Sequence, residues 1–175
     1  QKGRVFREAL FREFDELGLK SLGIVAFISF FIGGVIALQT ALNIENPFIP
    51  QYLIGFATKR SVILEFAPTF CSIILAGKVG SYFTSSIGTM RVTEQIDALE
   101  VMGVNTLNHL VLPKIIAAVS FYPFLVVLAM ILGIFGGWVS GIVTGLFSVT
   151  DYVEGIRLDF KPYLIRYALT KTMVF

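Results

Sequence analysis

Three long stretches of apolar residues, nearly free of charge, dominate the pattern along the chain. The first covers residues 21–44 and the third covers 115–150, and neither contains a charged residue. The second stretch, 61–90, is interrupted by Glu65 and Lys78. As helices rising 1.5 Å per residue, such stretches reach about 36 Å or more, enough to cross a hydrocarbon core of roughly 30 Å. The pattern therefore predicts three membrane-crossing helices.

The more polar segments indicate where the chain leaves the bilayer. Residues 1–20 mix charges with apolar side chains at helical spacing, which predicts an interfacial amphipathic helix or, alternatively, a solvated helix docked on the protein. Residues 91–109 are too polar to span a membrane and contain a short amphipathic helix. We expect the third crossing at about 111–138, because the glycines near its end weaken a helix. Residues 163–175 are too few to cross a bilayer, so we expect them to begin a fourth span.

Composition supports a membrane protein and excludes several other classes. Hydrophobic residues make up 55% of the chain and charged residues 15%, and the mean hydropathy is +0.80. This excludes a disordered chain and disfavours a soluble enzyme. A net charge of +2 does not indicate nucleic-acid binding, and one cysteine and one histidine provide neither a disulfide nor a histidine-rich metal site. We predict an all-α, polytopic membrane protein with one transmembrane domain over residues 1–175.

The distribution of basic residues predicts the orientation. The segment 1–20 contains five Lys and Arg residues, whereas the connectors at 43–60 and 147–162 contain two each. By the positive-inside rule, the N-terminus lies in the cytoplasm. The polar segment 91–109 then also lies on the cytoplasmic side.

Small residues recur about four positions apart in each apolar stretch, a spacing that lets helix backbones approach closely. These residues are Ser29, Gly33, Ala37 and Ala41 in the first stretch, Gly77, Gly80 and Ser81 in the second, and Gly133, Gly137 and Gly141 in the third. We therefore expect the second stretch to be covered by other helices on most sides.

Polar side chains at membrane depth are the candidates for function, because a charge in hydrocarbon is costly. Glu65 either lines a polar site for a substrate or pairs with Arg60 or Lys59 as an anchor at a helix end. Pro68, three residues later, can free a backbone carbonyl nearby. Lys78 is more readily interpreted as a packed lysine or one that reaches the interface.

Recognisable catalytic motifs are absent from the sequence. It contains no P-loop, no G-x-S-x-G and no H-E-x-x-H motif, and no nucleophile–base pair that would indicate an intramembrane enzyme. A stand-alone secondary transporter or channel that uses Glu65 and Lys78 remains an alternative.

His109 and Trp138 are interpreted as interfacial residues. The helix in 91–109 is either a handle for a partner protein or a segment packed on the bilayer surface.

The run AGKVGSYFTSSIGTMRVTEQIDALEVMGVN, residues 76–105, resembles the MlaE/YrbE-type permease family. These permeases are the membrane subunits of ABC transporters that work with MCE proteins in lipid trafficking. Leu112-Pro113 and the pair formed by Glu65 and Pro68 also fit the family pattern. The resemblance implies about five spans, an interfacial N-terminal helix and a cytoplasmic coupling helix.

The resemblance also implies partners and a location. It implies a permease homodimer in the bacterial inner membrane, bound to ABC ATPase subunits that hold ATP and Mg, with no cofactor in this chain. It implies a phospholipid pocket at the dimer interface that opens toward a periplasmic MCE-domain protein. The coupling helix would cover 92–103, with five residues at the ATPase groove: Thr93, Glu94, Gln95, Asp97 and Ala98.

The implied lipid pocket centres on Glu65, with Leu64 and Phe66 beside it and Phe48 as a looser candidate for its wall. Related members often have an arginine just before this glutamate, where this chain has Leu64. The basic partner would then be Arg60 or Lys59, or Glu65 would have none.

Overall fold

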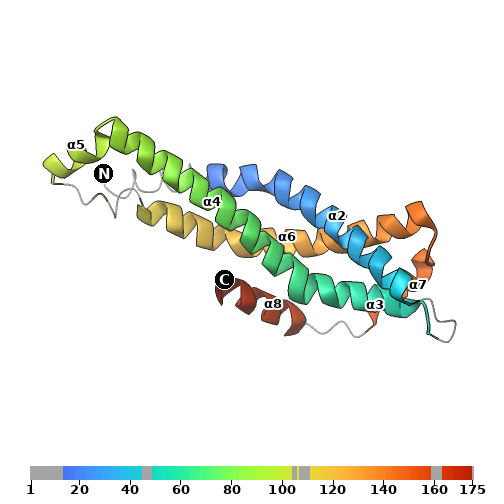
Figure 1. The fold of residues 1–175 in the computed structure, drawn as a ribbon. Helices are drawn as coiled ribbons and strands as arrows, with labels where there is room; N and C mark the ends of the chain where they lie inside the picture. Colours follow the sequence, from blue (N-terminus) through green and yellow to red (C-terminus); the bar gives the residue numbers. More distant parts are fainter. Residues whose placement is uncertain (1–13, 45–48, 104–105, 107–110, 159–162, 175) are drawn as a thin grey trace. The chain divides into compact units, whose positions relative to one another are not determined.

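The computed structural model describes residues 14–44, 49–103, 106, 111–158 and 163–174. Within these ranges the chain is helical and contains no strand (Figure 1). Two π-helical turns, η1 and η2, occur among the α-helices. In chain order the elements are η1 (Phe14–Leu19), α2 (Lys20–Asn43), α3 (Tyr52–Ser61), η2 (Val62–Phe66), α4 (Ala67–Val92), α5 (Gln95–Val101), α6 (Leu112–Thr144), α7 (Val149–Arg157) and α8 (Tyr163–Val174).

Three continuous helical stretches are long and apolar enough to cross a membrane: Leu17–Asn43, Tyr52–Val92 and Leu112–Thr144. The predicted all-α, polytopic membrane fold is therefore confirmed. In the second stretch, α3, η2 and α4 form one uninterrupted helix that begins at Tyr52 rather than at 61 (Figure 1). No proline interrupts residues 52–60, and a charged pair near a membrane interface does not end a helix.

The third stretch continues as a helix beyond 138, to Thr144. Gly145 follows with φ of +65°, and its N–H donates to the carbonyl of Gly141 at 3.0 Å. A glycine in this left-handed conformation is the common way to end a helix. The helix therefore continues six residues beyond 138, the expected end of the crossing.

The chain forms two compact units, and each long helix contributes one end to each of them. The first unit combines the described residues up to Gly23 with Ile73–Pro123, and the second combines Ile24–Ser72 with the residues from Phe124 onward.

In the second unit, glycines bring α2 and α6 into backbone contact. A β-carbon placed on Gly33 would overlap the carbonyl group of Gly133, and one placed on Gly136 would overlap the carbonyl of Phe30. Such close approach gains van der Waals contact without relying on the hydrophobic effect, which does not drive helix association in lipid. The ridge on α2 therefore lies against the glycines of α6.

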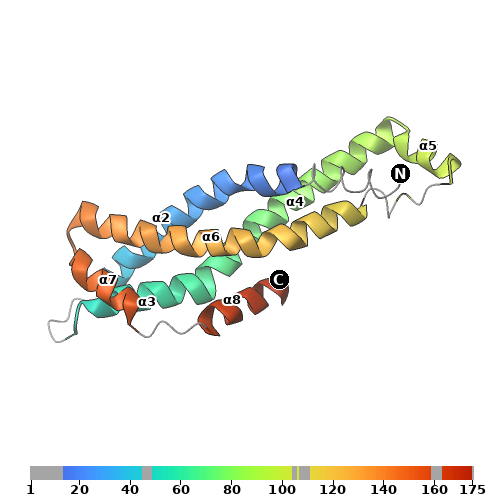
Figure 2. The same ribbon diagram turned by 180° about the vertical axis from the view of Figure 1, so that it is seen from behind.

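The second unit also contains a tight contact between α3 and α7, which both views show side by side (Figures 1 and 2). Gly55 lies against the backbone of Tyr152, and Gly155 lies against the backbone of Tyr52. The buried hydroxyl of Tyr152 donates to the carbonyl of Ile134 at 3.2 Å, and burial raises its pKa well above the ordinary value. This helix pair is thus fixed by backbone packing.

In the first unit, η1 packs on α6. Gly18 lies against the ring of Phe121, and the rings of Phe14 and Phe121 meet edge to face with centroids 6.2 Å apart. Residues 1–13 of the predicted interfacial helix lie outside the described residues. The described part of that segment, from Phe14, continues directly into α2.

Candidate functional site

A π-helical turn, η2, lies within the second membrane-crossing helix. The N–H of Ala67 donates to the carbonyl of Val62, five residues back rather than four. Pro68 follows, and in a regular α-helix its missing N–H would have bonded the carbonyl of Leu64. Turns of this kind inside α-helices are frequent at functional sites. The local sequence therefore frees a backbone acceptor next to Glu65.

The side chain of Lys171, on α8, reaches this freed carbonyl. Its ammonium Nζ lies 3.0 Å from the carbonyl oxygen of Leu64 and 3.0 Å from Oε2 of Glu65. The side chain of Glu65 is 67% exposed and that of Lys171 is 21% exposed. The ammonium thus satisfies the freed carbonyl and pairs with the carboxylate, while the carboxylate stays accessible in the single chain.

Glu65 thus pairs with Lys171, where the sequence had suggested Arg60 or Lys59. Lys59 is 1% exposed, and its ammonium donates to the carbonyl oxygens of Ile156 at 3.1 Å and Leu158 at 2.5 Å, at the end of α7. A cation is favourable there because helix ends leave carbonyls unpaired and carry partial negative charge. Lys59 thus binds the end of α7, and the cation that pairs with Glu65 comes from α8.

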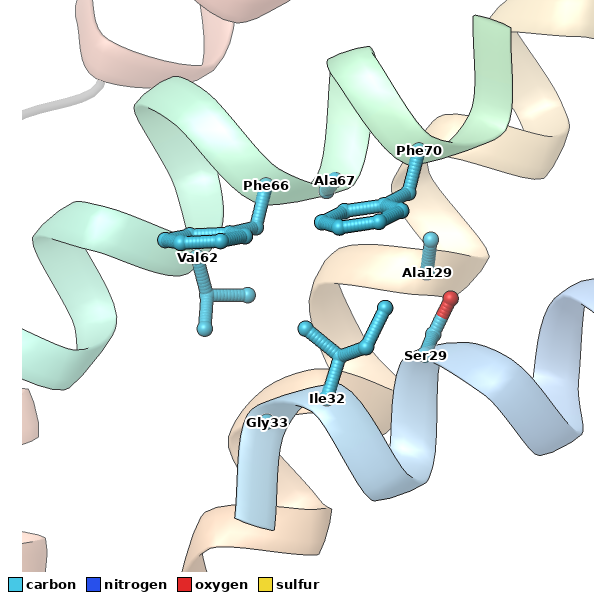
Figure 3. A pocket seen from close by; sticks show the side chains of 8 residues that line it. All are labelled: Ser29, Ile32, Gly33, Val62, Phe66, Ala67, Phe70 and Ala129. Atoms are coloured by element: carbon cyan, nitrogen blue, oxygen red, sulfur yellow. The ribbon is translucent and has the colours of Figure 1, made fainter. Parts of the chain in front are cut away.

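An apolar pocket lies on another face of the same helix (Figure 3). The rings of Phe66 and Phe70 stack with centroids 5.7 Å apart and lie over Ile32 of α2. The remaining lining residues are Ser29, Gly33, Val62, Ala67 and Ala129. Its volume is about 10 Å³, room for about one water molecule.

The residues predicted to line the lipid pocket thus lie on two different faces of the second membrane-crossing helix. Phe66 lines the apolar pocket, whereas Glu65 takes part in the ion pair with Lys171 and Leu64 offers that pair its carbonyl. Phe48 lies outside the described residues. Lys171 was missed in the sequence because it is 106 residues from Glu65, and no local pattern connects them.

The second candidate region is the exposed segment around α5, which begins at Gln95 rather than at 92. Thr93 and Glu94 form the turn before it, and Glu94 has φ of 57°, a left-handed value uncommon for a residue with a side chain. Arg91 and Asp97 form an ion pair across the turn at 2.5 Å. This pair fastens α5 to the end of α4.

No residue of α5 is buried in the described chain. Ala98 is exposed, as are Gln95, Asp97 and Glu100. The apolar Val92 and Val101 are 84% and 89% exposed. A short helix that shows both acidic and apolar side chains has the character of a protein-binding surface.

The small residues predicted to pack fall into two groups. Gly133, Gly137 and Gly141 contact α2, Tyr152 and Phe147 within the second unit. By contrast, the second stretch has no atom within 4 Å of a β-carbon placed on Gly77 or Gly80, and Ser81 is exposed. This part of α4 is open in the single chain.

Among the described residues, no group of three or more His, Cys, Asp or Glu could hold a metal ion. The chemistry that these residues offer is therefore ion pairing at Glu65 and Lys171, apolar contact at Phe66 and Phe70, and protein contact at α5.

Three helices long and apolar enough to cross a membrane, with an ion pair on one of them, define a multi-span membrane protein. The chain belongs to the MlaE permease family. The model of that family, described as Permease MlaE, matches residues 10–175.

Similar proteins have related names. The chain is 33% identical over 174 residues to a probable ABC transporter permease protein of Rickettsia prowazekii, covering 99% of this chain and 67% of that protein. It is 33% identical over 133 residues to the intermembrane phospholipid transport system permease protein MlaE of Haemophilus influenzae, covering 76% and 51%. It is 29% identical over 175 residues to the chloroplastic protein trigalactosyldiacylglycerol 1 of Arabidopsis thaliana, covering 99% and 49%. The chain thus spans about half to two thirds of the length of these relatives.

Proposed function

We propose that this protein is the permease subunit of an ABC transporter that moves phospholipids between the bacterial inner membrane and a periplasmic MCE-domain protein. Membership of the MlaE permease family supports this proposal, as do the names of the relatives from Rickettsia and Haemophilus. The three apolar helices support a multi-pass location in a membrane.

The ion pair between Glu65 and Lys171 is the observation that carries the proposal. Phospholipid headgroups carry a phosphate and often an ammonium, so a cation beside a carboxylate can bind both charges. The exposure of Glu65 leaves the carboxylate accessible to such a group. Apolar side chains on the same helix would contact the acyl chains, as in binding sites that combine an apolar lining with few polar groups.

The size of the apolar pocket indicates that one chain does not hold the lipid alone. A volume of about 10 Å³ holds about one water molecule and cannot hold an acyl chain. We therefore place the lipid between two copies of the permease, with Glu65 of each copy at the shared cavity. The open face of α4 leaves further surface for packing within such a homodimer.

The energy for transport would come from a partner. The sequence has no P-loop, so ATP and Mg are assigned to a separate ATPase subunit, and this chain is assigned no cofactor. The segment Thr93, Glu94, Gln95, Asp97 and Ala98 is exposed and supplies the contact with that subunit. In this arrangement α5 acts as the coupling helix.

Reconstitution tests the proposal. The permease is purified with its ATPase and the MCE-domain protein and placed in liposomes that contain a fluorescent phospholipid. We expect ATP-dependent lipid movement, which Glu65→Lys strongly reduces because two cations then face each other. The matched control is Glu154→Lys on the exposed face of α7, outside the three spans, which should assemble and transport normally.

Two results would overturn the proposal. One is lipid movement that persists without ATP or the ATPase, which would favour a stand-alone transporter. The other is normal transport by an assembled Glu65→Lys complex, which would reduce Glu65 to a structural role.

A further inference from the structure

Lys114 is a buried lysine in the first unit that the proposed lipid site does not use. It lies in the first turn of α6 and is 5% exposed. Its ammonium Nζ donates to Oγ of Ser86 on α4 at 3.0 Å. The same ammonium lies 4.2 Å from the centroid of the Tyr82 ring and 5.5 Å from that of Phe83.

The position of Lys114 is unfavourable for helix formation and for burial. The N-terminal end of a helix carries partial positive charge, which repels a cation. A charge removed from water also costs several kcal/mol unless it is well paired. An apolar side chain of similar length would fill the same space without these costs. The lysine makes directed contacts with Ser86 and Tyr82 that an apolar side chain could not make.

These contacts hold one face of α4. Ser86 and Tyr82 are four residues apart, so they lie on the same face of the helix. A hydrogen bond to one and a cation–π contact with the other fix both the position and the rotation of α4 against α6. Both interactions are directional, whereas apolar packing is not.

This end of α4 is only partly covered in the described chain. Within residues 76–92 no residue is buried in the described chain, and β-carbons placed on Gly77, Gly80 and Gly88 would meet open space. Lys114 is buried against this segment, whose own residues are half-buried or exposed. Its contacts with Ser86 and Tyr82 are called the α4–α6 clamp below.

The clamp lies close to the proposed coupling helix. Ser86 is six residues before Val92, where α4 ends, a distance of about 9 Å along the helix axis. The ion pair between Arg91 and Asp97 connects α5 to α4. The Thr93 hydroxyl, in the turn between them, donates to the Thr89 carbonyl of α4 at 2.8 Å. A displacement of α5 is therefore passed to the last turns of α4, and the clamp connects those turns to α6.

We propose that Lys114 is a positioning residue that transmits movement of the coupling helix from α4 to α6, so that ATP hydrolysis is coupled to lipid movement. This inference rests on the proposed function. It adds a role for a residue that contacts neither the lipid site around Glu65 nor α5. Without the clamp, the end of α4 moves with the ATPase while α6 does not follow.

The test measures ATP hydrolysis and lipid movement in the same reconstituted complex with its ATPase and MCE-domain protein. Lys114→Met keeps the length of the side chain and removes its charge. We expect this variant to assemble and to hydrolyse ATP within about twofold of the unchanged complex, while the lipid moved per ATP falls at least tenfold. Lys114→Arg retains a cation that donates to Ser86 and stacks on Tyr82, and it should retain most of the coupling.

Ser86→Ala provides a second, smaller perturbation. It removes the hydrogen-bond acceptor and should lower the lipid moved per ATP two- to fivefold, without affecting assembly. The matched control is Ser85→Ala, because Ser85 is the exposed neighbour of Ser86 on the same helix. Adding Ser86→Ala to Lys114→Met should cause no further loss, because both changes break the same clamp.

The proposal is overturned if Lys114→Met moves the normal amount of lipid per ATP, or if hydrolysis and transport fall in equal proportion. If Lys114→Met does not assemble, Ser86→Ala becomes the test. An unchanged amount of lipid moved per ATP in that variant overturns the proposal. Failure of the proposed function gives a different result, because the unchanged complex would then show no ATP-dependent lipid movement.

Discussion

Lys171 and Glu65 form an ion pair between α8 and a π-helical turn, with Nζ and Oε2 3.0 Å apart. The same ammonium also donates to the carbonyl of Leu64, in place of the N–H that Pro68 lacks. A proline that frees a carbonyl in a membrane-crossing helix is tolerated when a neighbouring helix supplies a donor. The pair therefore combines a structural role with an accessible carboxylate.

The buried ammonium of Lys59 should be important for the stability of α7. Lys59→Met removes two hydrogen bonds from a charged donor to the carbonyls of Ile156 and Leu158, and each such bond contributes about 1.5–3 kcal/mol. We expect local opening of α7 and faster tryptic cleavage at Arg157. Arg60→Met is the control, because Arg60 is exposed and its removal should change stability by no more than about 0.5 kcal/mol. Equal cleavage rates in the two variants would contradict this role.

The contact between α2 and α6 should not tolerate a single added methyl group. Gly33→Ala places a β-carbon where the carbonyl group of Gly133 lies, so the helices must separate. Overpacking of this kind costs about 1–3 kcal/mol. Thermal unfolding in detergent should show a lower midpoint for Gly33→Ala than for the unchanged protein.

Gly77→Ala is the matched control for that change. A β-carbon at Gly77 meets open space, and alanine favours a helix over glycine by about 0.5–1 kcal/mol. The isolated permease should therefore be unchanged or slightly stabilised. If both alanine variants lower the midpoint equally, the backbone contact between Gly33 and Gly133 is not what holds α2 to α6.

The acidic residues around α5 should determine binding of the ATPase. Glu94→Lys with Asp97→Lys reverses two charges in the segment and should weaken binding at least tenfold, because like charges across an interface are strongly unfavourable. Binding is measured by titrating the ATPase onto the permease in detergent. Arg91→Ala breaks the ion pair with Asp97 but keeps both acids, so it separates loss of that pair from loss of the surface charge. Unchanged affinity in the double variant would move the coupling surface elsewhere.

The membrane-crossing helices could be predicted from the sequence because hydropathy and charge are local properties. The absence of charge in 21–44 and 115–150 was sufficient to place two of the three. The start of the second helix at Tyr52 was not evident, because Lys59 and Arg60 look like the end of a connector. In the structure Lys59 is buried, and its charge is satisfied by the end of α7.

The partners in the candidate site depend on contacts between distant segments. Glu65 and Pro68 are only three residues apart and drew attention to the site. Lys171 comes from a helix that the sequence shows only as the start of another apolar segment. Lys114 lies just before the uncharged stretch 115–150, and its burial depends on Ser86 and Tyr82 of another helix. Neither lysine could be assigned a role before the helices were placed together.

A charge-swap experiment tests the central claim most directly. Lipid movement per ATP is measured for Glu65→Lys, Lys171→Glu and the double variant with both changes, in the complete reconstituted complex. We expect each single change to lower lipid movement at least tenfold and the double variant to recover a substantial part of it, because the ion pair is restored in reverse. Normal transport by both single variants would contradict the claim that this pair forms the polar part of the lipid site.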